Sequence, residues 1–172
     1  KEFKFINDTS GVVNILNNLA SINYRKGNYE KALSQYLECL KLDESKNNYS
    51  GIASGYNNIS NVYSNLNQFN KSIHYAEKAT QMYQPLSDKQ GLIKGYINLT
   101  RNYYLLQNYQ QSLAYIDSAE VLALNINDNY NLGKIYNSKG SALNKLKRHK
   151  EAYDYFQKSL EFSNQESDPL GY

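Results

Sequence analysis

The chain has 172 residues, with 19 Lys and Arg against 16 Asp and Glu, which gives a formal net charge of +3. This length excludes a long multidomain enzyme, and the charge is too small to indicate nucleic-acid or membrane binding. No apolar run is long enough to span a membrane. One cysteine and two histidines exclude an internal disulfide and argue against a zinc site, so we expect no cofactor.

The sequence repeats with a fixed period. The segment Gly27–Leu33 aligns with 67–73, 107–113 and 147–153, and the equivalent residues Ala32, Ser72, Ser112 and Ala152 are each 40 positions apart. Such a period is typical of a repeat protein. We predict an all-α chain of four units at approximately 9–48, 49–88, 89–128 and 129–168.

Each unit is predicted to form two helices, called helix A and helix B. The four A helices are expected at 11–26, 51–66, 91–106 and 131–146, and the B helices from about Tyr29, Phe69, Tyr109 and His149. An oxygen acceptor suited to capping precedes every helix A, in the series Asp8, Asn48, Asp88 and Asp128. Between the two helices, Gly27 and Asn67 tolerate a left-handed turn, whereas Gln107 and Lys147 do so less well.

The two ends of the chain extend this pattern. Residues 1–8 match the tail of a preceding helix B, and residues 169–172 match the start of a further repeat. We therefore expect a piece of a longer array.

Small residues recur where two helices must approach closely, as in Ala20, Ser60, Thr100 and Gly140 of helix A and their partners Ala32, Ser72, Ser112 and Ala152 of helix B. Large residues fill the layers between them. This pattern resembles the tetratricopeptide repeat, in a branch with a longer period. Lys139, in place of an apolar residue, and Asn23, in place of Tyr, depart from it.

The resemblance implies an α-solenoid of antiparallel helix pairs in a right-handed superhelix, with helix A lining a concave groove. On that face of every helix A the residues are strongly polar. We predict a peptide-binding groove built from residues of all four repeats: Asn14, Asn18, Tyr24, Asn58, Asn61, Lys94, Asn98, Arg101, Tyr104, Lys134 and Ser138.

Two features of this face point to a ligand. Asn18, Asn58 and Asn98 repeat in register, and each amide can both donate to and accept from one peptide unit. In addition, no Asp or Glu lies in the predicted A helices, although Lys and Arg occur there. A groove with cations alone favours an acidic segment or a free C-terminal carboxylate.

Two more specific functions, binding of a chaperone tail and catalysis, fit the sequence less well. Asn61, Asn98 and Lys134 match three positions of the clamp that some family members use for acidic chaperone tails, but Asn57 and Ser138 stand where its Lys and Arg belong. Catalysis has no basis either, because the histidines and Cys39 occupy packing or surface positions of the repeat.

We therefore expect a peptide-binding or protein-binding module within a larger signalling or transcriptional regulator, and not an enzyme. The alternative is a structural scaffold that only spaces or dimerises other domains, through the partial units at the chain ends.

Overall fold

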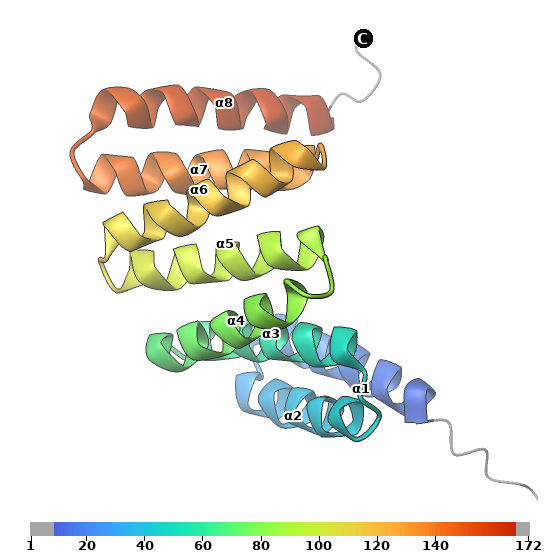
Figure 1. Ribbon diagram of the computed structural model, residues 1–172. Helices are drawn as coiled ribbons and strands as arrows, with labels where there is room; N and C mark the ends of the chain where they lie inside the picture. Colours follow the sequence, from blue (N-terminus) through green and yellow to red (C-terminus); the bar gives the residue numbers. More distant parts are fainter. Residues whose placement is uncertain (1–8, 168–172) are drawn as a thin grey trace, which may run out of the picture.

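The computed structural model describes residues 9–167, which form eight α-helices and no strand (Figure 1). Their bounds are α1 Thr9–Arg25, α2 Tyr29–Ser45, α3 Tyr49–Asn65, α4 Phe69–Tyr83, α5 Lys89–Leu105, α6 Tyr109–Asn125, α7 Asn129–Lys145 and α8 His149–Ser167. The predicted all-α fold is confirmed, and α1, α3, α5 and α7 are the A helices. The partial units predicted at 1–8 and 169–172, like the cap Asp8, lie outside the described residues.

The B helices begin at the predicted residues, whereas the A helices begin two residues earlier than predicted. The predicted caps explain this difference, because a capping side chain accepts from the third helical residue and the helix must follow it directly. Asp88 accepts from the amide of Gly91 at 2.8 Å, and Asn48 and Asp128 cap α3 and α7 in the same way. Helix α4 ends at Tyr83, two residues before the equivalent ends of α2 and α6, because Pro85 has no amide N–H to continue the helical hydrogen bonds.

Every turn described between helices contains a residue with positive φ. Gly27 and Asn67 adopt it as predicted, but so do Gln107 and Lys147, with φ of 60° and 61°. The short turn that ends each helix A therefore imposes the left-handed conformation even on residues that favour it little.

The two helices of each hairpin meet at the predicted small residues, which are buried. In the second hairpin the Ser60 hydroxyl donates to the carbonyl oxygen of Ser72 at 2.9 Å, and the Ser72 hydroxyl donates to that of Ser60 at 2.7 Å. In the third, the Ser112 hydroxyl donates to the Thr100 carbonyl oxygen at 3.0 Å. The serine hydroxyls at this contact are thus satisfied by the backbone of the facing helix, whereas the Thr100 hydroxyl donates to the Tyr96 carbonyl oxygen of its own helix.

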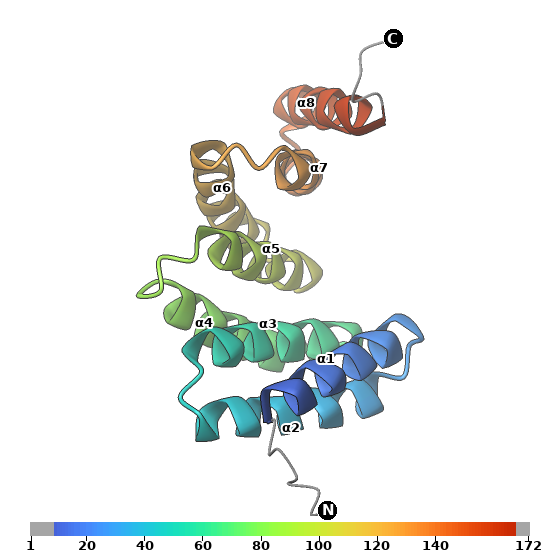
Figure 2. The same cartoon turned by 90° about the vertical axis from the view of Figure 1, so that its right-hand side faces the viewer.

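Each helix packs on the next, and the hairpins stack from α1 and α2 at one end to α8 at the other (Figures 1 and 2). Helix α5 also contacts both α3 and α7 across the repeats. Among the described residues, no comparable contact joins two B helices. The repeats are therefore closest on the side of the A helices, which places these helices on the concave face.

In the first hairpin Asn23 replaces the tyrosine of the repeat pattern, and a second polar residue, Gln35, lies opposite it. Tyr63 stacks on Tyr75, with ring centroids 5.4 Å apart, and the third hairpin has the equivalent stack. In the first hairpin Asn23 and Gln35 hold these positions, and the amide of Asn23 donates to the oxygen of Gln35 at 2.8 Å. A polar pair thus replaces an aromatic pair.

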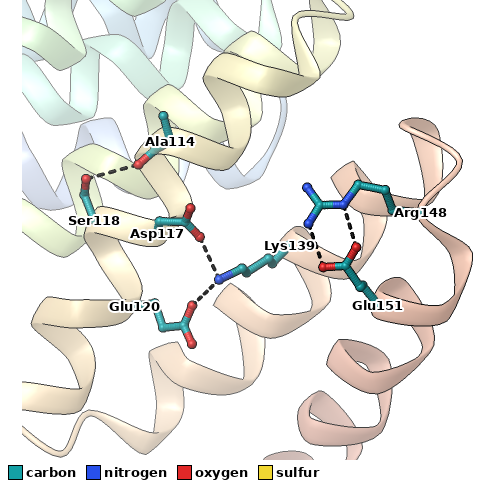
Figure 3. A network of polar contacts seen from close by, with 7 residues as sticks. All are labelled: Ala114, Asp117, Ser118, Glu120, Lys139, Arg148 and Glu151. Carbon is teal, nitrogen blue, oxygen red and sulfur yellow. Dashed lines mark hydrogen bonds and ion pairs between the residues drawn. The ribbon is translucent and has the colours of Figure 1, made fainter.

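Lys139 is likewise accommodated by a partner helix (Figure 3). Its side chain is 14% exposed, and its ammonium lies 2.6 Å from a carboxylate oxygen of both Asp117 and Glu120 on α6. Burial disfavours the ammonium, but its hydrogen bonds to both carboxylates raise the pKa of Lys139 above its usual value. A charged group therefore replaces apolar packing between α6 and α7.

We predict that Lys139→Leu lowers the free energy of unfolding by about 2 kcal/mol, because it leaves the Glu120 carboxylate without its cation. The double variant Lys139→Leu with Glu120→Leu is expected to recover most of this loss, since the preceding repeats have Ile59 and Leu40 at these positions. Denaturant unfolding measures both. A single variant as stable as the parent would contradict the role of the ion pair.

A second prediction concerns Asn102, which is buried in α5 and whose side-chain oxygen has no partner among the described residues. Its equivalent in α3 is the buried Val62. Asn102→Val is expected to raise the free energy of unfolding by about 1 kcal/mol, because it removes an unsatisfied acceptor. Val62→Asn, the reverse change one repeat earlier, is expected to lower it. A shift of the denaturation midpoint in the opposite direction for Asn102→Val would refute this.

Candidate functional site

The concave face carries positive charge without acidic residues. Helices α1, α3, α5 and α7 contain no Asp or Glu within their observed bounds. Their cations are Arg25, Lys89, Lys94, Arg101, Lys134, Lys139 and Lys145. Lys139 is neutralised by α6, so the remaining cations determine the potential along these helices.

A first hollow of about 240 Å³ lies between α1 and α3. It contains three of the predicted residues, Tyr24, Asn58 and Asn61, together with Ser21, Arg25 and Tyr36. Burial raises the pKa of Tyr36, and a hydrogen bond with Ser21 opposes this shift. The hollow therefore offers neutral donors and acceptors, with one cation beside them.

A second hollow, of about 420 Å³, lies between α5 and α7. It brings together Arg101 and Tyr104 from α5 with Lys134 and Ser138 from α7, all predicted site residues. The rest of its lining is Ile97, Thr100, Ser112, Asn137 and Ser141. Two exposed cations beside an isoleucine and a tyrosine suit a carboxylate that is attached to an apolar group.

Lys134 also borders a further hollow of about 360 Å³ between α7 and α8. Its ammonium lies 3.6 Å from the centroid of the Tyr130 ring, one helical turn away. This cation–π contact holds the lysine at the edge shared by the two hollows. Sequence reasoning missed Tyr130, although its spacing of four residues from Lys134 was the available signal.

The Asn98 side chain bonds a neighbouring helix, although the in-register asparagines were expected to bind a peptide ligand. Its side-chain amide donates to the oxygen of Asn57 at 2.9 Å, and both residues are buried between α3 and α5. Asn17 is the equivalent of Asn57 one repeat earlier, and its buried side-chain oxygen has no partner in the described part of the chain. The Asn row therefore serves partly to join A helices.

Asn65 of α3 forms side-chain hydrogen bonds to both neighbouring A helices, α1 and α5. Its amide donates to the Tyr24 hydroxyl at 2.6 Å, and its oxygen accepts from the Arg101 guanidinium at 3.5 Å. These bonds cross from α1 through α3 to α5 and link a residue of the first hollow with one of the second. Sequence reasoning did not identify this connection.

The remaining predicted residues lie outside the two hollows. Asn14, Asn18 and Lys94 are exposed on their helices and line neither the α1–α3 nor the α5–α7 hollow. The structure thus divides the predicted groove into an amide-rich part and a cationic part. Within residues 9–167, no group of three or more His, Cys, Asp or Glu side chains is arranged to hold a metal, and no helix is long and apolar enough for a membrane span.

Two sequence models of the tetratricopeptide repeat family match the chain, over residues 11–85 and 130–166. A comparison with curated proteins finds no match. Among solved structures, BtubC (BKLC) from P. vanneervenii is similar with a TM-score of 0.83 and 20% identity, over 96% of this chain and 67% of that one.

Two further structures are similar over a smaller share of their own length. Aspartyl phosphate phosphatase F from Bacillus subtilis has a TM-score of 0.89 and 14% identity, over 95% of this chain and 43% of the phosphatase. The Rap conjugation gene regulator of plasmid pLS20 was solved in complex with the Phr* peptide. It has a TM-score of 0.75 and 19% identity, over 92% of this chain and 46% of the regulator. The chain thus spans less than half of either protein. With the two family matches and the helical hairpins, the chain belongs to the tetratricopeptide repeat family, and its repeats form a protein-binding module of that family.

Proposed function

We propose that the concave face binds an extended acidic segment of a partner protein, or its free C-terminal carboxylate. The observation that carries this proposal is the pairing of Arg101 and Lys134 in one hollow, on helices that contain no carboxylate. Cations from two repeats converge there, so a single acidic group can contact both.

The α1–α3 hollow has a complementary role in this proposal. Asn58 and Asn61 present amide donors and acceptors beside the hydroxyl of Tyr24. Groups of this kind bind the N–H and C=O of a peptide unit whatever its side chain. The ligand is thus held by its backbone at α1–α3 and by its charge at α5–α7.

In this proposal the module is the partner-recognition part of a larger signalling or transcriptional regulator, and it catalyses no reaction. The peptide complex of the pLS20 regulator, whose fold is similar, supports this choice. A scaffold that binds no peptide stays the alternative.

A matched pair of charge variants tests the cationic hollow. Arg101→Gln with Lys134→Gln is expected to weaken binding of an acidic peptide pool about ten-fold, because two charge contacts of roughly 0.5–1 kcal/mol each are lost. Lys41→Gln with Lys150→Gln removes the same charge from exposed positions on α2 and α8 and is the control. Fluorescence anisotropy measures both, and equal losses in the two variants would contradict a localised site.

The amide-rich hollow needs a separate test. Asn58→Ala is expected to weaken binding about five-fold for acidic and neutral peptides alike, since one backbone hydrogen bond contributes about 1 kcal/mol. Asn58 is preferable to Asn98 as the mutated residue, because truncating Asn98 removes the partner of Asn57. Asn70→Ala, on the exposed surface of α4, is the control. Unchanged affinity of Asn58→Ala would exclude backbone capture at this position.

A further inference from the structure

The contact between α5 and α7 lacks a side-chain bond that joins α3 to α5. In that earlier contact the amide of Asn98 donates to the oxygen of Asn57 at 2.9 Å, and both residues are buried. The equivalent residues of α5 and α7 are Ile97 and Ser138. Ile97 has no acceptor, and the Ser138 hydroxyl donates to the Lys134 carbonyl oxygen of its own helix at 2.9 Å. This pair therefore forms no bond across the two helices.

The α5–α7 hollow lies where this bond is missing, between the third and fourth repeats. Ile97 and Ser138 both line it. Its volume of about 420 Å³ is within the range of roughly 300–1,000 Å³ that is typical of ligand pockets. The α1–α3 hollow also lies at a contact without the bond, since the Asn17 side-chain oxygen has no partner within residues 9–167. At about 240 Å³ it is the smaller of the two.

The hydroxyl groups that line the α5–α7 hollow need no hydrogen-bond acceptor from a ligand. Four of them already donate to backbone carbonyl oxygens at 2.8 to 3.0 Å, namely Thr100 to Tyr96, Ser112 to Thr100, Ser138 to Lys134 and Ser141 to Asn137. Ile97 and Tyr104 add apolar surface between them, and both are half-buried. An apolar side chain can therefore enter the hollow without leaving a hydroxyl donor unsatisfied.

The cations of the same hollow are exposed, in contrast to Ile97. Arg101 follows Ile97 by one helical turn, and Lys134 faces them from α7. Lys94, the equivalent of Lys134, is exposed although both α3 and α7 contact α5, so this position of an A helix is accessible inside the stack. A ligand can thus place a carboxylate on the cations and an apolar group against Ile97 at the same time.

Ile97 distinguishes α5 from the other A helices. At the equivalent position α1, α3 and α7 have Asn17, Asn57 and Asn137. An asparagine here presents an amide, as Asn57 does to Asn98. Isoleucine instead leaves α5 without this bond to α7 and gives the hollow an apolar wall beside its two cations.

We propose that the α5–α7 hollow binds a large aliphatic side chain of the ligand next to an acidic one, and that Ile97 determines this preference. The inference rests on the proposed function and specifies its ligand. Successive side chains of an extended segment point to opposite sides, so two side chains that enter one hollow come from residues two positions apart. The ligand is thus an extended segment in which a leucine or isoleucine lies two positions from an Asp or Glu.

Three acetylated and amidated peptides test the proposal by fluorescence anisotropy. Their central segments are Leu-Ser-Glu-Ser-Leu, Ser-Leu-Glu-Leu-Ser and Ser-Ser-Glu-Ser-Ser, each between further serines, so the glutamate side chain is the carboxylate of each peptide. The parent chain is expected to bind the first about ten-fold more tightly than the other two, because it buries a leucine side chain. Ile97→Asn should reduce this preference to less than about three-fold, and Ile97→Val should keep most of it.

Val121→Asn is the control, because it changes an exposed aliphatic residue of α6 that lies outside the hollow, and it should keep the full preference. Equal affinity of the parent for the three peptides overturns the proposal, and so does an unchanged preference in Ile97→Asn. If that equal binding is lost in Arg101→Gln with Lys134→Gln, only this inference fails. Binding of none of the three also overturns it, and the acidic peptide pool then shows whether the proposed function survives.

Discussion

The close approach of the two helices in each hairpin is the constraint on which the other features depend. It requires small residues on both helices, and where these are serines their hydroxyls bond the facing backbone, as between Ser60 and Ser72. A larger side chain here separates the helices and changes the angle at which the next repeat starts. The placement of the A helices, and with it the concave face, follows from this contact.

Two departures from the repeat pattern occur in spatial pairs. Asn23 faces Gln35 where the second and third hairpins have stacked tyrosines, and Lys139 faces Asp117 and Glu120 where the first joint, between α2 and α3, has Ile59 and Leu40. A single polar substitution at either place would leave a buried group unsatisfied. The partner residue removes that cost, and it also makes the joint specific, because α7 fits only a B helix that carries the matching acids.

The sequence predicts the helices well because the period repeats each local signal four times. The starts of the A helices were misplaced by two residues because the cap was read as lying ahead of the helix, when it adjoins the first helical residue. The left-handed turns were expected to be less favourable at Gln107 and Lys147, but the short turn after helix A imposes this conformation there too. At the candidate site, residue type predicted Arg101 and Lys134, which line one hollow, but did not indicate that Asn98 would bond Asn57. That contact joins residues on two helices, which no pattern within one helix contains.

The contacts between A helices also determine how the array deforms. Hydrogen bonds at Asn57–Asn98 and Tyr24–Asn65 join the repeats on the inner side, while the outer B helices have no comparable link among the described residues. We therefore expect tension applied to the ends of the array to change the pitch of the superhelix before it breaks the hydrogen bonds between the A helices.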